Sequence, residues 1–129
     1  MYISVVTLSV ADVGRAAQFY VERLGWTVTM DEAMGEGMRW ITVAPPGEKT
    51  SLTLTAGGPA WSAEKVGGFS GVILEVDDVF ATHHELERRG VEFAEPPRRE
   101  PWGGWAMIVD SEGNRLGLHS PAEAEAEAA

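Results

Sequence analysis

Cysteine is absent from the 129 residues, so the chain forms neither disulfides nor thiolate metal sites and has no cysteine nucleophile. Long apolar runs are missing as well, because stretches such as residues 71–74 fall far short of the roughly 20 residues that a membrane helix needs. The first ten residues lack the charged and then apolar pattern of a secretory leader. These absences predict a cytoplasmic protein without a membrane partner.

Basic side chains are scarce. Lys and Arg number 10 against 20 Asp and Glu, which gives a formal net charge of −10. Nucleic-acid binding needs a basic stripe that displaces counterions from phosphates, so we expect no nucleic-acid partner. The low-complexity residues 121–129 are expected to form a disordered acidic tail. The remaining negative charge either keeps the protein soluble or favours a cationic ligand.

The chain does contain an internal repeat. Residues 6–13 reappear in pattern as residues 72–79. Each copy alternates apolar and other side chains, as a half-buried strand does, and then reaches an aspartate that can cap a helix. An apolar pattern of helical spacing follows, and it ends at Gly25 in the first copy and at Gly90 in the second. Each module therefore begins with a strand, a helix and a glycine stop.

Three further strands are expected in each module. They lie near residues 26–30, 38–43 and 51–55 in the first module and near 91–93, 105–109 and 115–119 in the second. A loop rich in proline and arginine is expected between the first two of these strands in the second module. The fold class is therefore α+β, a single domain with two tandem βαβββ modules at residues 1–55 and 70–120 and a linker at 56–69.

The pleat of these strands places different side chains on the two faces of the sheet. One face is uniformly apolar and is expected to lie under the helices. The opposite face combines aromatic, thioether and polar groups, which suits a small-molecule pocket inside a curved, cup-like sheet. Alternatively, this face packs on the other module or on a partner subunit. The candidate ligand-binding residues are Thr7, Ser9, Met38, Trp40, Thr53, Glu75, Trp105, Met107, Arg115 and His119.

Glu75 and His119 are the candidates for acid–base catalysis. Both are expected to face one cavity, and an imidazole with an intrinsic pKa of about 6.5 exchanges protons near neutral pH. The alternative is a salt bridge at the rim among Glu75, Arg115 and His119. His83 is expected to be a core or interface histidine, and His84 is expected to point to solvent.

Three tryptophans lie in or beside predicted loops. Trp61, Trp102 and Trp105 stand near the Gly-Gly pairs 67–68 and 103–104, which are expected to flex as lids. A tryptophan on such a lid closes over a flat or cationic ligand by stacking. The alternative is that these side chains are buried in a dimer interface.

Several short motifs occur in a specific order. They are the strand and aspartate at residues 6–12, Phe19-Tyr20, Leu24-Gly25, residues 74–79, and the turn and strand at residues 110–116. Together they resemble the glyoxalase/bleomycin-resistance protein/dioxygenase group, the vicinal oxygen chelate superfamily. The resemblance implies the βαβββ fold and, commonly, a homodimer. It does not imply one activity, because the family includes metal-dependent lyases, isomerases and dioxygenases as well as metal-free proteins that sequester drugs.

Metal-using members of this family carry His, Glu or Gln ligands on the inner face of four strands. The corresponding positions here are Val5, Thr53, Gly71 and Gly117. None offers an imidazole or a carboxylate, whereas a divalent ion needs several N or O donors that converge on one point. The resemblance therefore implies a member that lacks the usual metal ligands, and we expect no cofactor.

These observations predict a metal-independent small-molecule-binding protein that sequesters an aromatic or cationic ligand and forms a homodimer. One alternative is a lyase, isomerase or dioxygenase-type enzyme of the same superfamily that acts on a small oxygenated metabolite. Another is a non-catalytic domain whose tryptophan-rich face is an oligomer interface.

Overall fold

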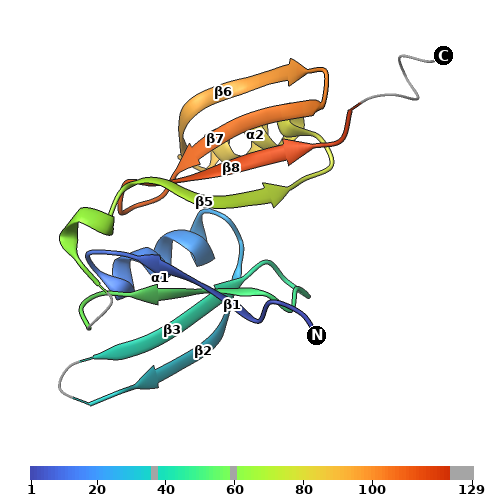
Figure 1. Cartoon of the computed structure of the whole chain (residues 1–129). Coiled ribbons are helices and arrows are strands. Elements are labelled where there is room, and N and C mark those ends of the chain that lie inside the picture. The colour runs from blue at the N-terminus through green and yellow to red at the C-terminus, as the bar shows by residue number, and fades with distance from the viewer. Residues whose placement is uncertain (36–37, 59–60, 123–129) are drawn as a thin grey trace. The chain divides into compact units, whose positions relative to one another are not determined.

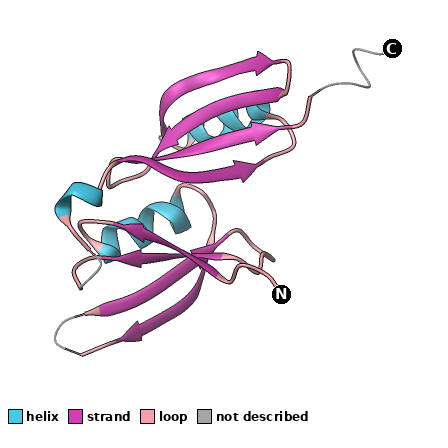
Figure 2. Ribbon diagram, viewed as in Figure 1, coloured by secondary structure: helices cyan, strands magenta, loops and turns pink. Residues whose placement is uncertain are grey.

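The computed structural model describes residues 1–35, 38–58 and 61–122, and the two halves of the repeat form the same succession of elements (Figure 1, Figure 2). The first contains β1 (Val5–Ser9), α1 (Val13–Glu22), β2 (Thr27–Ala33), β3 (Arg39–Ala44) and β4 (Ser51–Thr55). A 3₁₀ helix at Ala63–Lys65 follows. The second contains β5 (Gly68–Glu75), α2 (Val79–Arg88), β6 (Glu92–Glu100), β7 (Gly103–Val109) and β8 (Asn114–Ser120). Most of the expected acidic tail, residues 123–129, lies outside the described residues.

Each half of the repeat forms one four-stranded sheet, as the sequence predicts. The strand order is β1-β4-β3-β2 in the first sheet and β5-β8-β7-β6 in the second. In the first sheet β1 runs parallel to β4, while β3 runs antiparallel to both β4 and β2. In the second, β7 runs antiparallel to β6 and β8. The predicted α+β class with two βαβββ modules is confirmed.

The chain divides into two compact units by its contacts. The first unit contains residues 1–68 together with the turn at 110–114, and the second contains residues 69–109 and continues from 115. In the first unit α1 packs on β2, β3 and β4, and in the second α2 packs on β6 and β7. One helix therefore covers one face of each sheet.

Both α-helices begin at the aspartates that the repeat predicts. The Oδ1 atom of Asp12 accepts a hydrogen bond from the backbone N–H three residues later, and that of Asp78 from the N–H two residues later, each at 2.9 Å. Such bonds satisfy donors that have no partner inside the helix. Gly25 and Gly90 follow the helices with φ of 75° and 86°, so the predicted glycine stops are confirmed. None of the described helices is long and apolar enough to cross a membrane.

The apolar sheet faces under the helices form the cores of the units. Large side chains there lose all or nearly all contact with solvent, and each contributes roughly 1.5–3 kcal/mol by its burial. In the first unit these side chains are Val10, Tyr20, Ile41, Val43 and Leu54. In the second unit they are Val79, Ile108, Leu116 and Leu118.

The repeat extends to individual backbone hydrogen bonds. The N–H of Val10, after β1, donates to the carbonyl of Thr55 at the end of β4 (2.9 Å). The N–H of Val76, after β5, donates to the carbonyl of His119 near the end of β8 (2.8 Å). Thr55 and His119 therefore hold equivalent places in the two modules.

Strand β6 is longer than the sequence predicts. The proline- and arginine-rich segment after Phe93 continues the strand to Glu100, so the prediction of a loop there is wrong. β6 is the outer strand of its sheet, where proline is tolerated because its missing N–H need not face a neighbouring strand. Its pairing with β7 shifts register between Phe93 and Glu95 and again between Glu95 and Arg98. These irregularities accommodate the two prolines within the strand.

The turn at residues 110–114 packs within the first unit. Asp110 accepts hydrogen bonds from the backbone N–H groups of Glu112 (2.8 Å) and Asn114 (2.9 Å) and from the hydroxyl of Tyr20 (2.8 Å). The side-chain amide of Asn114 donates to the carbonyl of Ser9 (3.0 Å). Burial raises the pKa of Asp110, while the hydrogen bonds from Tyr20 and the turn oppose that rise. This motif of the family resemblance thus has a structural role beside α1.

Candidate functional site

Four side chains of the second unit meet at one end of its sheet. Glu75 ends β5, His119 lies on β8, Trp102 stands in the turn before β7, and Trp105 lies on β7 opposite His119. The Nδ1 atom of His119 lies 2.6 Å from Oε1 of Glu75, and its Nε2 atom lies 3.2 Å from the carbonyl oxygen of Trp102. The strand positions thus bring Glu75 and His119 together as the sequence suggests, while their functional role remains a prediction.

The aromatic rings of this group form a corner. Trp102 stacks on the imidazole of His119 with ring centroids 5.9 Å apart and planes 18° apart. Trp102 and Trp105 are also 5.9 Å apart, but their planes meet at 72°. The indole N–H of Trp105 donates to Glu95 at 3.1 Å. We call Trp102, Trp105 and His119 the aromatic corner.

Two glycines allow the backbone to approach this corner closely. A Cβ on Gly103, whose φ is 134°, would lie 2.2 Å from the carbonyl oxygen of Ser120 and 2.8 Å from Nε2 of His119. A Cβ on Gly104 would lie 2.5 Å from Val79. Both glycines are buried in β7. The prediction that this pair flexes as a lid is therefore wrong, because close packing requires glycine here.

Trp61 and the glycines at 67 and 68 are also held by hydrogen bonds. The N–H of Gly67 donates to the side chain of Asn114 at 2.7 Å, and that of Gly68 donates to the carbonyl of Gly113 at 3.2 Å. The indole N–H of Trp61 donates to the carbonyl of Val10 at 2.9 Å. These bonds tie the segment to the first unit, so its expected role as a lid is not supported.

The hydrogen-bond partners of His119 define its protonation. The carboxylate of Glu75 and the carbonyl of Trp102 are both acceptors, so each ring nitrogen must carry a proton to donate to its partner. The hydrogen bond to Glu75 is the main cause that raises the pKa of His119, and the bond to Trp102 adds to it. Both observations favour the imidazolium form of His119 near neutral pH.

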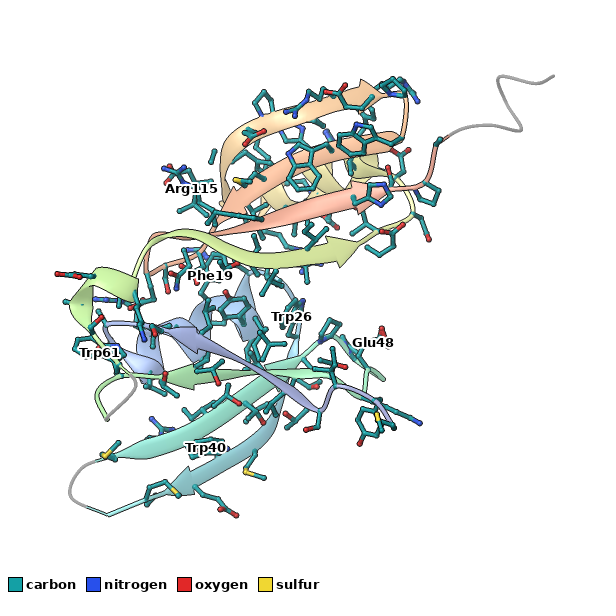
Figure 3. All side chains as sticks on the ribbon, viewed as in Figure 1. Phe19, Trp26, Trp40, Glu48, Trp61 and Arg115 are labelled. Carbon is teal, nitrogen blue, oxygen red and sulfur yellow. The ribbon has the colours of Figure 1, made fainter. Side chains whose placement is uncertain are left out.

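The other candidates in the second unit lie apart from this contact. Met107 is buried on β7 opposite Gly117. Arg115 is exposed at the start of β8, four residues before His119 (Figure 3). Of the salt bridge considered among Glu75, Arg115 and His119, the described residues form the Glu75–His119 part alone.

A row of hydroxyl groups occupies the corresponding face of the first unit. Thr29 Oγ1 lies 2.5 Å from Thr42 Oγ1 and 2.9 Å from Ser51 Oγ. Thr53 stands opposite both Thr7 and Thr42 in the strand register and is fully buried. Its Oγ1 has no hydrogen-bond partner among the residues that the structure describes. A buried hydroxyl without a partner is costly, so this atom is a candidate for contact with a buried water molecule. Its full burial does not support the prediction that Thr53 binds a ligand.

The remaining candidates of the first unit differ in exposure. Thr7 and Met38 are exposed, whereas Ser9 is half-buried. Trp40 is half-buried on β3, where it faces Glu32 of β2 in the register (Figure 3). Thr7 and Trp40 remain candidates, but among the described residues of this unit no side-chain hydrogen bond or ring contact joins them into a cluster comparable to the aromatic corner.

The family positions for metal ligands do not fit a metal in this chain. Val5, Gly71 and Gly117 have no donor side chain, and Thr53 offers one neutral hydroxyl. A Cβ on Gly117 would lie 2.4 Å from Cη2 of Trp105, so the indole fills the space that a ligand side chain needs. Across residues 1–35, 38–58 and 61–122, no group of three or more His, Asp or Glu side chains could hold a metal ion.

A shallow depression lies beside the first turn of α2 in the second unit. Its volume is about 30 Å³, and Asp78, Phe80, Arg99 and Glu100 contribute to its walls. This volume holds a water molecule or two, but organic ligands occupy pockets of roughly 300–1,000 Å³. The depression is therefore not a ligand pocket.

The two histidines of α2 lie away from the aromatic corner. His83 is half-buried, with its ring edge-on to Phe93 at 4.6 Å and its Nε2 atom 3.3 Å from Glu87. His84 is exposed, as predicted. His83 thus packs at the edge of the core, which agrees with a structural role.

Known proteins are similar to this chain in sequence and in architecture. The family model described as "Glyoxalase/Bleomycin resistance protein/Dioxygenase superfamily" matches residues 2–118. The uncharacterized protein YetH of Bacillus subtilis (strain 168) is 30% identical over 112 residues, which are 87% of this chain and 92% of that protein.

Solved structures agree with the sequence match. TnmS3, an antibiotic binding protein from Streptomyces sp. CB03234, is 35% identical with a TM-score of 0.81, over 95% of this chain and 97% of that one. A superfamily member from Sphaerobacter thermophilus DSM 20745 is 32% identical with a TM-score of 0.82, over 93% and 97% of the two chains. This chain therefore belongs to the glyoxalase/bleomycin resistance protein/dioxygenase superfamily.

Proposed function

We propose that the protein is a metal-independent small-molecule-binding protein that sequesters an aromatic, cationic ligand. The observation that carries this proposal is the aromatic corner, in which two indoles meet at 72° beside a carboxylate. Trp102 is 53% exposed although its side chain is large and apolar. An exposed aromatic surface beside fixed polar groups is typical of a binding site.

The corner offers two kinds of contact to a flat ligand. A planar ring can stack on Trp102 while Trp105 presents the perpendicular arrangement that aromatic pairs also favour. Glu75 uses Oε1 for His119, and its side chain is 61% exposed, so its second carboxylate oxygen can accept from a ligand. A cationic group on the ring would gain from both the indole face and this carboxylate.

One relative supports binding rather than a particular reaction. TnmS3, at 35% identity, is an antibiotic binding protein. The donor set at the family's metal positions in this chain lacks imidazole and carboxylate groups. A binding function needs neither, and it therefore accounts for these substitutions more simply than metal-dependent catalysis does.

Acid–base catalysis by His119 is less well supported. A general base needs a free lone pair, but both ring nitrogens of His119 face acceptors in this structure. His119 would have to break its contact with Glu75 or with Trp102 before it accepted a proton. This geometry favours a structural task for the imidazole within a binding site.

The test is a thermal-shift and calorimetry panel of planar aromatic cations, such as acridinium and quinolinium salts, with neutral rings of the same shape as controls. A ligand that binds only the native state, present at a free concentration of 100 times its Kd, raises the free energy of unfolding by about 2.7 kcal/mol. We expect cations to bind better than the neutral rings. Trp102→Ala should weaken binding about tenfold, whereas the exposed His84→Ala should not change it. Absence of binding throughout the panel would contradict the proposal.

The proposal includes a homodimer. Exposed apolar side chains gather on β1 and the residues before it, where Tyr2, Ile3, Val5 and Val6 are 37–68% exposed. Apolar surface of this kind is typical of a protein interface. Native mass spectrometry at micromolar concentration should give twice the chain mass of 13.9 kDa, and a monomer under those conditions would contradict this part of the proposal.

A further inference from the structure

Trp102 is an exposed side chain in a turn, yet it is held from three directions. Its ring stacks on His119 and forms a T-shaped pair with Trp105, and its own carbonyl accepts a hydrogen bond from Nε2 of His119. His119 is in turn fixed by Glu75 through the 2.6 Å contact at Nδ1. A free tryptophan in a turn would lose conformational entropy on binding a ligand, and these contacts remove that loss in advance.

We propose that Glu75 and His119 are positioning residues, which hold Trp102 as a preorganised wall of the aromatic corner. The contact chain runs from the carboxylate of Glu75 through the imidazolium of His119 to both the ring and the carbonyl of Trp102. The inference rests on the proposed function for its effect on ligand affinity. The fixing of Trp102 itself does not depend on any ligand.

The repeat provides an internal comparison for this assignment. Ser9 and Thr55 lie at the places in the first module that Glu75 and His119 have in the second. The equivalent backbone hydrogen bonds form in both modules at 2.9 Å and 2.8 Å. The fold therefore does not require a carboxylate and an imidazole at these places. Glu75 and His119 are instead found where Trp102 contacts His119, so the positioning of the Trp102 ring explains why these two side chains are present.

Gly103 is part of the same arrangement. It follows Trp102 with φ of 134°, and any Cβ there would collide with Ser120 and approach Nε2 of His119 to 2.8 Å. The missing side chain allows the carbonyl of Trp102 to come within 3.2 Å of the imidazole. Backbone geometry and side-chain chemistry thus act on the same contact.

The imidazolium form is needed for both hydrogen bonds at once. Loss of one proton would leave a ring nitrogen facing an acceptor and would break one side of the chain of contacts. Glu75 on β5 is the charged group in contact with His119, and the turn before β7 contributes the carbonyl of Trp102. On β6, Glu95 is engaged by Arg98 at 2.8 Å and by Trp105. On β7, Trp105 itself carries no charge, and on β8 Arg115 lies four residues from His119.

The first arm of the test needs no ligand. ¹⁹F NMR of protein labelled with 5-fluorotryptophan, with Trp102 assigned by Trp102→Phe, reports the order of that ring directly. We expect the Trp102 resonance to shift or broaden in His119→Ala and in Glu75→Gln, while that of Trp61 stays unchanged. His84→Ala is the matched control, because its imidazole is exposed on α2. An unchanged Trp102 resonance in His119→Ala would overturn the assignment.

A pH titration of the same sample separates positioning from general destabilisation. The wild-type Trp102 resonance should move with the ¹³C-detected titration of His119, and Glu75→Gln should shift both midpoints to lower pH together. A structural disturbance alone would not couple the two midpoints. A Trp102 resonance that ignores the His119 titration would contradict the proposal.

The second arm uses the best ligand of the aromatic cation panel. His119→Ala should weaken its binding about tenfold, and Trp102→Ala/His119→Ala should bind no more weakly than Trp102→Ala alone, because both changes remove the same wall. Additive losses would show that His119 acts independently of Trp102. If the panel yields no ligand, the proposed function fails while the NMR arm still decides the positioning role.

Discussion

The two βαβββ modules build nearly the same backbone around different chemistry. The first module carries Ser9 and Thr55 where the second carries Glu75 and His119, and the flanking backbone hydrogen bonds are the same. On the same face of its sheet the first unit has a row of hydroxyl groups, toward the other end of β4, whereas the second unit has two indoles, an imidazole and a carboxylate at the end of its sheet. The repeat therefore constrains the strands and caps but leaves the residues of this face free to differ.

The family's metal positions show the same divergence. Thr53 in the first module keeps a polar atom, which is fully buried and lacks a hydrogen-bond partner among the described residues. Gly117 in the second module has no side chain, and Trp105 occupies the space that one would need. The two modules thus differ at the family's ligand position, where one has a small buried hydroxyl and the other has a glycine whose side-chain space an aromatic ring fills.

The largest effect is expected from the turn that belongs to the first unit. Asp110→Ala leaves the Tyr20 hydroxyl and the N–H groups of Glu112 and Asn114 without their acceptor. We expect the free energy of unfolding, measured by urea denaturation, to fall by about 3 kcal/mol. Tyr20→Phe removes one of these bonds and should cost about 1 kcal/mol. Equal costs for the two variants would contradict this account of the turn.

A second test addresses Gly117, the family's metal-ligand position in the second module, whose side-chain space Trp105 fills. Gly117→Ala forces Trp105 to move, because the new Cβ would lie 2.4 Å from its Cη2 atom, and should destabilise the protein by about 2 kcal/mol. The same change should cost much less in a Trp105→Ala background. A double-mutant cycle of urea denaturation measures the difference, and no coupling between the two positions would show that Trp105 does not occupy this space.

Thr53→Val is the corresponding test in the first module, and its sign is opposite. The valine keeps the shape of the threonine but removes an unpaired buried hydroxyl, so stability should rise by about 1 kcal/mol. Thr42→Val is the control, since it breaks the hydrogen bond to Thr29 and should destabilise. If Thr53→Val destabilises the protein, the hydroxyl has a partner such as a buried water molecule, which would contradict the account of Thr53 as an unpaired group.

The smallest expected effect is in the pH dependence of stability. Burial acts to raise the pKa of Glu112, but hydrogen bonds from Arg15, Ser111 and two backbone N–H groups outweigh it and lower the pKa to about 2. Its folded-state pKa lies below the unfolded value of 4.5, so its stabilisation is present above pH 4.5 and is lost as pH falls toward 2. The guanidinium of Arg15 is 54% exposed, so solvent screens the pair and we expect about 0.5 kcal/mol.

His119 affects the pH dependence of stability above pH 6.5, where Glu112 has no effect. Its pKa is raised above the unfolded value of 6.5, so its stabilisation is present below pH 6.5 and is lost as pH rises through the folded-state pKa. Glu112→Gln should therefore reduce the fall in the free energy of unfolding as the pH drops from 4.5 toward 2. His119→Ala should reduce the fall in the free energy of unfolding as the pH rises above 6.5. Urea unfolding curves at pH 3 to 9 check both. A variant that changes the pH dependence in the other residue's range would contradict the assignment of that charge.

Parts of the candidate site follow from local patterns and parts do not. The Glu75–His119 contact is predictable, because strand alternation puts both side chains on one face of neighbouring strands. Thr29 was missed, because it stands where the pairing of β2 with β3 shifts register between Val28 and Met30. No local pattern in the sequence marks that shift. The packing role of Gly103 was also missed, since a glycine next to a tryptophan reads equally well as a hinge.

The sequence by itself determined the two modules, their helix caps, their glycine stops and the side chains of each strand face. These features depend on periodicity and on contacts within a few residues, which the order of amino acids states directly. Only the tertiary structure decided that β6 extends to Glu100, that the turn at 110–114 packs beside α1, and that His119 faces two acceptors. Those features depend on atoms brought together from residues 17 to 90 positions apart, and chain folding rather than local propensity determines which of them meet.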